Sequence, residues 1–302
     1  DTYRKAFTNE LLDQAYDGRV AHDLLAEGGY VEIDDAYWAP TGCILYDASK
    51  FYLPFQFIDS LGGITRVSYD PSGLLLERTT DPVGNVIEVE FDYQSLQPSR
   101  IRDQNSNDTL CAYDALGFLK QLARRGKGEG DDLSDPTVDF TYDLDAWQRD
   151  GEPAWARTSS KQKYGDNTIP RQTVYTYTSG FGQEVMRKEQ AQPGDAPLRG
   201  SDGELLRNPD GSLVIGFVSE RWIGTGRTVF DNKENVVKQY EPFFSSTPDY
   251  EDEDDLVECG VTPIFFYDPL SRLVETELPN GTRRRVEFDA WEQAEWDEND
   301  AI

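Results

Sequence analysis

The sequence has few of the residues on which catalysis and metal binding most often depend. Its 302 residues include one histidine and three cysteines. His22, the single histidine, lies in an expected helical segment with no serine or cysteine motif near it, so a surface or packing role is favoured over catalysis. Cys43, Cys111 and Cys259 are odd in number and widely spaced. They indicate buried free thiols and support neither a disulfide framework nor a zinc site.

Basic residues and long apolar runs are also scarce. Lysine and arginine number 29 against 57 aspartates and glutamates, giving a net charge of −28 and a pI near 4.3. This balance argues against nucleic-acid and anionic-membrane partners, whose binders carry basic patches. No apolar run approaches the length of a membrane span, so we expect no direct membrane insertion. The sequence shows no signal peptide and starts without methionine, and we expect it to be a segment of a longer protein.

In contrast to these scarce residues, the sequence contains an 11-residue repeat over residues 57–118. Aspartate recurs at that step six times, at Asp59, Asp70, Asp81, Asp92, Asp103 and Asp114. Three residues after each comes glycine or serine, at Gly62, Gly73, Gly84, Ser95, Ser106 and Gly117. An aromatic residue precedes every second aspartate, at Tyr69, Phe91 and Tyr113. A fixed period of this kind is the mark of a repeat architecture.

The repeat length fits a strand of about seven residues and a turn of about four. Aspartate opens such a turn because its carboxylate can accept hydrogen bonds from the backbone ahead, and glycine or asparagine tolerates the positive φ that follows. Between the turns apolar and polar residues alternate, as in Ile64–Tyr69, which is typical of a half-buried strand. We therefore predict an antiparallel β-meander with successive turns on opposite edges. The aromatic residues would then form a ladder along one edge, two strands apart.

The Tyr-Asp-x-x-Gly-x-Leu units resemble the YD repeats of the Rhs/YD family. More widely, the chain resembles the C-terminal part of the B component of the bacterial Tc (toxin complex) insecticidal toxins, the group named with the virulence protein SpvB. The matching stretches are LLAEGGYV at 24–31, FYLP at 51–54, LQP at 96–98, YEPFFS at 240–245, GVTP at 260–263, FYDP at 266–269 and WDEND at 296–300. The resemblance covers nearly the whole chain except residues 191–212 and the acidic run.

The resemblance implies an all-β fold in which YD-type strands form part of a large hollow shell. In the family, the B and C components together enclose a toxic effector and release it into the pore-forming A component. The implied partners are therefore a C component, the enclosed effector and the A-component pore. The implied location is extracellular, within a toxin complex made in the cytoplasm. No cofactor and no catalytic residue are expected, because the self-cleaving protease of such shells belongs to the C component and no matching motif occurs here.

Three segments are predicted along the chain. Residues 1–29 form a short helical lead-in, with helices over 8–17 and 20–27, and residues 30–145 form the meander with the 11-residue period. Residues 146–302 continue the shell with inserted loops at 191–212 and 247–258. The repeat returns near the C-terminus at Tyr267 and Asp268. We expect the aspartates, glycines and aromatics of the repeat to hold the shell together.

Polar and charged stretches between these strands are predicted to be exposed. Residues 126–136 indicate a solvated loop, and residues 249–255 a mobile acidic loop. Residues 191–212 are rich in glycine, proline and aspartate and predict a small exposed hairpin with turns at Asp202-Gly203 and Asp210-Gly211. The short basic runs at Arg124-Arg125 and 283–285 are expected to form ion pairs with nearby carboxylates.

Two other kinds of function stay open on the sequence. Asp103, Asn105, Asn107 and Asp114 fall at positions 1, 3, 5 and 12 of a calcium-type loop, although Asp108 stands where that motif needs glycine and no helices flank it. The tryptophans near the C-terminus, Trp291 and Trp296, are compatible with a carbohydrate-binding surface, but core and edge-capping aromatics are commoner in large β structures.

A hydrolase with a carboxylate pair is the third hypothesis. Most of the aspartates recur at turn positions, and a turn role explains them without chemistry. The position of the carboxylates distinguishes the hypotheses. Carboxylates that converge in one concave pocket would favour a hydrolase, whereas carboxylates spread along sheet edges would favour a structural role.

Overall fold

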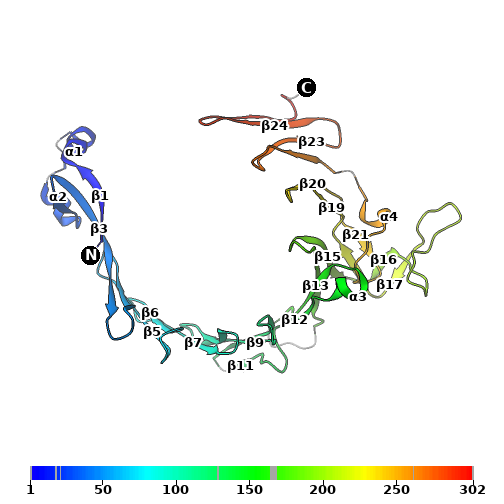
Figure 1. Ribbon diagram of the computed structural model, residues 1–302, viewed down its shortest axis with the longest axis horizontal. Coiled ribbons are helices and arrows are strands. Elements are labelled where there is room, and N and C mark those ends of the chain that lie inside the picture. The colour runs from blue at the N-terminus through cyan, green and yellow to red at the C-terminus, as the bar shows by residue number, and fades with distance from the viewer. Residues whose placement is uncertain are drawn as a thin grey trace. The chain divides into compact units, whose positions relative to one another are not determined.

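The computed structural model describes residues 2–17, 19–20, 22–127, 129–163, 169–260 and 262–300. The chain divides into two compact units, Asp1–Thr137 and Val138–Ile302. Antiparallel pairing accounts for the strand pairs of both units, and the four helices of the described residues are short (Figure 1). The predicted all-β meander is confirmed. The predicted segment boundaries after residues 29 and 145 remain predictions.

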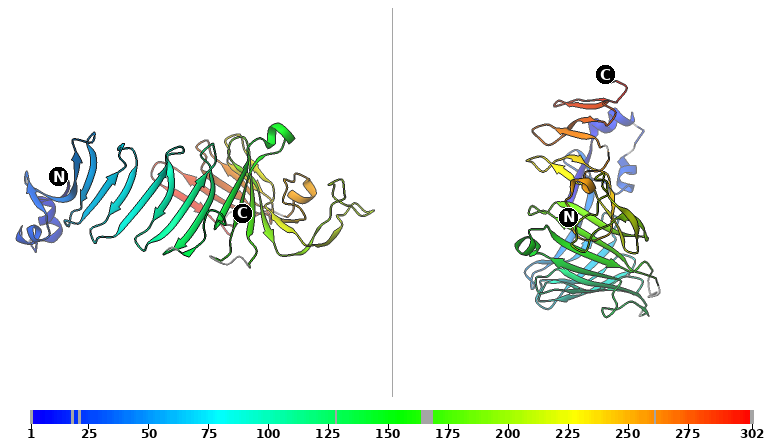
Figure 2. Two further views of the ribbon diagram at one scale, coloured as in Figure 1. Left: turned by 90° about the horizontal axis from the view of Figure 1, so that it is seen from below. Right: turned by 90° about the vertical axis from the view of Figure 1, so that its right-hand side faces the viewer.

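The first unit is a strand series in which nearly every strand pairs with the next. β3 (Ala36–Asp47) pairs with both β1 (Thr2–Thr8) and β2 (Val31–Ile33), and its second half pairs with β4 (Leu53–Ile58). From there the chain runs up and down, and Figure 2 shows these strands side by side as one layer. The remaining strands are β5 (Ile64–Tyr69), β6 (Leu76–Thr80), β7 (Val86–Asp92), β8 (Gln97–Arg102), β9 (Asn107–Tyr113), β10 (Leu119–Gly126) and β11 (Glu129–Gly130).

The lead-in contains both expected helices, α1 (Asn9–Tyr16) and α2 (His22–Glu27). Thr8 caps α1, because its hydroxyl accepts a hydrogen bond from the Leu11 N–H at 3.2 Å. Leu12 and Leu25, one from each helix, pack with Tyr37 in a small core cluster. The sequence did not predict strand β1, which precedes the helices and pairs with β3. The side chain of His22 lies outside the described part of the chain.

The second unit contains two main sheets and a hairpin. The first sheet runs β12 (Val138–Asp143), β13 (Ala154–Ser160), β14 (Gln172–Thr178), β15 (Glu184–Ala191), β18 (Arg221–Gly224) and β21 (Phe243–Ser245). The second runs β19 (Thr228–Phe230), β20 (Val236–Gln239), β22 (Ile264–Tyr267), β23 (Leu273–Glu277), β24 (Arg283–Phe288) and β25 (Gln293–Trp296). The helices are α3 (Ala146–Asp150) and α4 (Asp254–Val257).

The predicted excursion at 191–212 is a longer hairpin than expected. β16 (Gly194–Pro197) pairs with β17 (Ile215–Val218), and beyond this pair the isolated bridges Arg199–Leu205 and Arg207–Leu213 close two short hairpins. Gly203 and Gly211 have φ of 88° and 89°, as the predicted Asp-Gly turns require. Its base is not exposed, because Ala196 is buried.

Among the described residues, the buried hydrophobic side chains form two small clusters and no single large core. The larger lies in the second unit and consists of Tyr177, Met186, Phe243, Leu256 and Val257. A single layer of strands leaves each face partly open to solvent, so most strand residues are half-buried. The same geometry corrects the expectation for the cysteines: Cys43, Cys111 and Cys259 are free but only half-buried.

Candidate functional site

The turns of the meander share one hydrogen-bonding arrangement. After β4, the Oδ1 atom of Asp59 accepts the backbone N–H groups of Leu61 and Gly63, each at 2.8 Å. The backbone adds two bonds, from the Asp59 N–H to the Gly63 carbonyl and from the Gly62 N–H to the Asp59 carbonyl. One carboxylate therefore closes a five-residue turn. It also accepts hydrogen bonds from two backbone N–H groups that would otherwise have no partner within the turn.

The same pattern joins each turn aspartate to the residues two and four positions ahead in several further turns. It occurs at Asp81, Asp103, Asp114, Asp231 and Asp268. The residue three positions after the aspartate has φ between 61° and 91° in these turns. Serine or glutamate takes this conformation at Ser106, Glu234 and Ser271, and glycine at Gly84 and Gly117. At Asp92 the positive φ falls instead on Leu96, one residue later.

Asp70 differs from the other turn aspartates because it is buried, with 2% of its surface exposed. It accepts the backbone N–H groups of Ser72, Leu74 and Leu75, and the hydroxyl of Tyr93 at 3.1 Å. The bond from Leu75 and the others lower the pKa of Asp70 despite the opposing effect of burial. Gly73 follows it with φ of 69°. Tyr93, which lies outside the repeated positions of the sequence, links the turns after β5 and β7 on one edge of the sheet.

The aromatic residues of the repeat bond to the neighbouring strand. Tyr69 and Tyr113 donate their hydroxyls to the carbonyls of Pro54 and Pro98, at 3.0 and 2.8 Å. In the second unit Tyr267 donates to the Val236 carbonyl at 2.8 Å. Burial is the main cause that raises the pKa of Tyr113 to about 12. Phe91, at the equivalent place, has no hydroxyl to donate.

A row of alternating charge crosses five strands of the first unit. Arg78, Glu88, Arg102, Asp108 and Arg125 lie directly opposite one another across β6 to β10. Arg78 pairs with Glu88 at 3.1 Å, and Asp108 pairs with Arg102 at 3.0 Å and Arg125 at 3.4 Å. The row lies on one face, because residues directly opposite in neighbouring strands share a face.

Asp108 is the least exposed residue of this row, with 2% of its side chain exposed. Arg100 adds a two-pronged contact to both of its oxygens at 3.1 Å and also pairs with Glu90. The hydrogen bonds from Arg102 and Arg100 hold the pKa of Asp108 well below its usual range, against the effect of burial. The residue that breaks the calcium motif is thus a buried carboxylate that pairs with three arginines.

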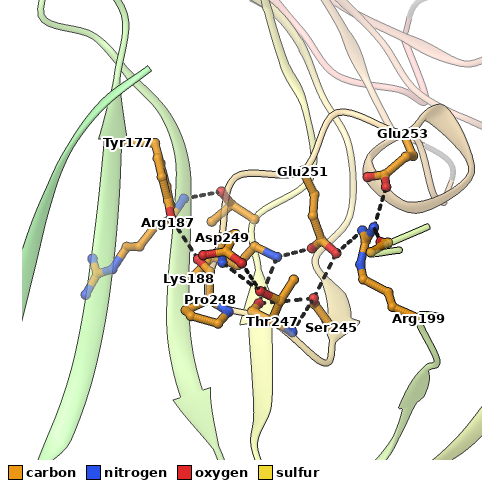
Figure 3. A network of polar contacts seen from close by, with 12 residues as sticks. Tyr177, Arg187, Lys188, Arg199, Ser245, Thr247, Pro248, Asp249, Glu251 and Glu253 are labelled. Atoms are coloured by element: carbon orange, nitrogen blue, oxygen red, sulfur yellow. Dashed lines mark hydrogen bonds and ion pairs between the residues drawn. The ribbon is translucent and has the colours of Figure 1, made fainter. Parts of the chain in front are cut away.

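A second buried network joins β15 to the acidic segment 249–255. Figure 3 shows Lys188, Arg199 and Ser245 converging on Glu251. Lys188 forms an ion pair with Glu251, and the two side chains are 0% and 3% exposed. Arg199 bonds to Glu251 at 2.5 Å and to Glu253 at 2.7 Å. Ser245 donates its hydroxyl at 3.0 Å to the same Glu251 oxygen, Oε1, that accepts the Arg199 bond, while Lys188 contacts the other oxygen.

Burial lowers the pKa of Lys188, while the Glu251 carboxylate opposes that shift. For Arg199 burial acts in the same downward direction, but the bonds to Glu253 and Glu251 outweigh it and raise its pKa. The Lys188 ammonium group also lies 4.8 Å from the centre of the Phe243 ring. Each buried charge therefore has a charged or π-electron partner, as burial of charge requires.

The prediction of a mobile acidic loop at 249–255 is wrong. Glu251 is 4% exposed, and the segment leads into α4, whose Leu256 and Val257 belong to the larger core cluster. Four carboxylates of the run are paired with cations distant in sequence: Glu251 with Lys188, Glu253 with Arg199, Asp254 with Arg227 and Asp255 with Arg207. The predicted loop at 126–136 also contains structure, since β11 pairs with β10 and Asp131 is buried.

The four residues of the calcium hypothesis do not come together. Asp103, Asn105 and Asn107 share the turn before β9, while Asp114 follows the far end of that strand. The seven residues of β9 place Asp114 roughly 20 Å from the other three residues. Both oxygens of Asp103 already bond to Asn105 and Asn107. Within the described ranges, no cluster of three or more histidine, cysteine or acidic residues has the arrangement of a metal site.

The turn carboxylates lie along sheet edges and not around one pocket. The predicted basic run at 283–285 forms ion pairs as expected: Arg283 with Glu275, Arg284 with Glu298 and Arg285 with Glu287. In the other run, Arg125 pairs with Asp108. Trp291 is 94% exposed. In the part of the chain described here, no helix is both long and apolar enough to cross a membrane.

Comparison with known proteins gives matches among solved structures alone. No protein-family model matches the chain, and no curated protein matches it. The structure of TcdB2-TccC3 matches with a TM-score of 0.82 and 23% identity over 99% of this chain. That of TcdB2-TccC3-Cdc42 matches with a TM-score of 0.78 and 20% identity over 98%. A Tc holotoxin pore of Photorhabdus luminescens, with a mutation in TccC3, matches with a TM-score of 0.77 and 19% identity over 98%.

The chain spans 16–18% of the length of these matching chains. The likeness covers both compact units, including the stretches that carried the sequence resemblance. The chain therefore has the fold of a region of the TcdB2-TccC3 Tc toxin complex, which confirms the expected resemblance to the Tc toxin shell at the level of fold.

Proposed function

We propose that this chain is a structural segment of a B-type Tc toxin component, a YD-repeat β-shell that encloses a toxic effector together with a C component. The effector would then pass through an A-component pore. The observation that carries the proposal is the match over 98–99% of the chain to Tc toxin structures. Its site of action is extracellular, as part of the assembled complex.

In this proposal the functional residues are those that hold the sheet. The turn aspartates, the positive-φ residues behind them and the tyrosines that bond across strands close the edges of each hairpin. The charged row around Asp108 links one strand to the next, and the network around Glu251 links β15 and β21 to the segment before α4. No residue acts as a catalyst, and the carboxylates serve as hydrogen-bond acceptors and ion-pair partners.

Limited proteolysis of the full-length protein, co-expressed with its C partner and the effector, tests this proposal. The enclosed effector should resist added protease until the shell is opened. Glycine-to-valine changes at Gly73, Gly84 and Gly117, which have φ of 69° to 91°, should open it and speed effector digestion. An effector digested equally fast in the intact and the altered complexes would contradict encapsulation.

A calcium- or carbohydrate-binding module is the alternative function. The separation of Asp103 from Asp114 disfavours calcium, and the exposed Trp291 is the observation that keeps a sugar surface open. If the shell proposal holds, the purified protein should leave generic esterase, glycosidase, phosphatase and protease substrates intact. Robust turnover that is lost on changing one aspartate would favour the hydrolase hypothesis.

A further inference from the structure

An apolar groove lies in the second unit beside helix α3. Its volume is about 510 Å³, and its lining includes Leu144, Trp147, Pro153, Val185 and Tyr250. The side chains of Leu144 and Trp147 remain 49% and 70% exposed. Large apolar side chains gathered around an open groove are typical of interaction sites and not of an ordinary solvated surface.

The groove is held in a fixed shape by the packing behind it. Tyr250 packs against Tyr177, with ring centres 5.6 Å apart. The Tyr177 hydroxyl bonds to the Pro248 carbonyl at 2.8 Å, two residues before Tyr250. The buried Glu251 fixes the chain immediately after it. A groove formed in advance loses little conformational entropy when a ligand binds.

Carboxylates adjoin the groove lining: Asp150 and Glu152 lie between the lining residues Gln148 and Pro153, and Asp249 and Asp252 lie on either side of the lining residue Tyr250. Burial raises the pKa of Glu152, and the charges of Asp150, Asp249 and Asp252 raise it further, so these four carboxylates lie close enough to act on one another. Burial and the charge of Asp252 likewise raise the pKa of Tyr250, which lines the groove.

Cations also act on these carboxylates. Lys188, which acts on Asp249, is already paired with Glu251. Arg149 acts on Glu152. It is bound to Asp143 at 2.8 Å and to Asp150 at 2.7 Å, so much of its charge is neutralised locally. Arg227, which also acts on Tyr250, is paired with Asp254 and Glu258. The apolar groove therefore adjoins a group of carboxylates.

We propose that this groove docks a polypeptide segment of another chain that presents an apolar side chain flanked by lysine or arginine. The apolar side chain would fill the groove, while the flanking cations would face the carboxylates and the Trp147 ring. A second copy of this chain fits less well, because each copy carries a net charge of −28. The inference does not depend on the proposed shell function.

Fluorescence anisotropy with the full-length protein tests the proposal. The probe is a labelled peptide of alternating leucine and lysine, compared with a leucine and glutamate peptide of the same length. The lysine peptide should bind roughly tenfold or more tightly than the glutamate peptide. Trp147→Ala should weaken its binding by roughly tenfold. Asp252→Asn together with Glu152→Gln should weaken it too, and should reduce its dependence on salt concentration.

Trp291→Ala is the matched control, because Trp291 is 94% exposed and is not among the residues that line the groove. The Trp291→Ala protein should bind the lysine peptide as tightly as the unaltered protein does. Thermal melts of each variant separate loss of binding from loss of fold. Equal binding of the lysine peptide to the Trp147→Ala protein would overturn the proposal. So would Trp147-dependent binding of a neutral oligosaccharide without binding of the peptide, or self-association that Trp147→Ala abolishes.

Discussion

The Lys188 ammonium group and the Glu251 carboxylate form a buried ion pair between residues 63 positions apart in the sequence. Through this pair, strand β15 holds the acidic segment that precedes α4. The neighbouring strand residue Arg187 instead pairs with Glu189 at the surface, where both side chains are nearly half exposed. The two pairs offer a comparison of buried and exposed charge on one strand.

Removing one partner of the buried pair should be costly. Glu251→Gln leaves Lys188 charged and without its carboxylate, and should lower the free energy of unfolding by about 3–5 kcal/mol. Replacing both residues, Lys188→Met with Glu251→Leu, should cost less than the sum of the single changes. Glu189→Gln, the exposed control, should cost less than about 1 kcal/mol. Denaturant unfolding of the full-length protein measures these three variants together with the single changes Lys188→Met and Glu251→Leu; strictly additive single effects would argue against coupling.

A β-branched residue at Gly84 should strain the turn after β6. Gly84 has φ of 91° and an added Cβ would meet no atom within 4 Å, so the cost of Gly84→Val comes from the backbone conformation alone. We expect a loss of about 1–2 kcal/mol. Thr79→Val, at a strand position opposite Val67 and Ile87, should be nearly neutral. Thermal melts compare the two, and equal losses at both positions would contradict the turn assignment.

Asp70 should make the turn after β5 sensitive to acid. Its pKa is lowered in the folded protein, so the stability it contributes is present above the unfolded pKa of about 3.9 and is lost as pH falls through the folded value. The difference in melting temperature between the unaltered protein and Asp70→Asn should therefore be largest near neutral pH and shrink below about pH 4. Asp59→Asn, in an exposed turn, is the control and should destabilise less. A difference that grows on acidification would reverse the expected sign.

The net charge of −28 predicts a salt effect on the whole molecule. Repulsion among the carboxylates should make the folded state less stable at low ionic strength, because the Debye length is then long. The melting temperature should rise from low salt to about 1 M NaCl, where the Debye length is about 3 Å. NaCl is preferred to sulfate, since sulfate also strengthens burial of apolar surface. An unchanged melting temperature would rule out a large repulsive contribution.

Local features of the fold could be predicted because their causes are local. An aspartate and a residue of positive φ three positions later lie within one turn, so their spacing in the sequence is their spacing in space. The alternation within Ile64–Tyr69 indicates its two faces for the same reason. The Thr8 cap also follows from neighbouring residues.

Contacts between distant residues could not be predicted in this way. The acidic run at 249–255 has the composition of a solvated loop, and nothing near it in the sequence shows that Lys188 and Arg199 neutralise Glu251. Asp108 was noted only as a departure from a calcium motif, although its three arginine partners come from strands on both sides. The docking groove was also missed, since its lining comes from residues 144 to 250.

The row of alternating charge in the first unit bears on how similar strands avoid pairing in the wrong order. Repeats of one length and pattern can exchange neighbours during folding, and misassembly is a known failure of repeat proteins. If β7 paired with β9 and skipped β8, Glu88 would lie near Asp108; if β6 paired with β8, Arg78 would lie near Arg102. Like charges placed opposite each other destabilise a sheet. The row thus disfavours pairings in which a strand skips its neighbour and joins the next strand along, because such pairings place side chains of like charge opposite each other.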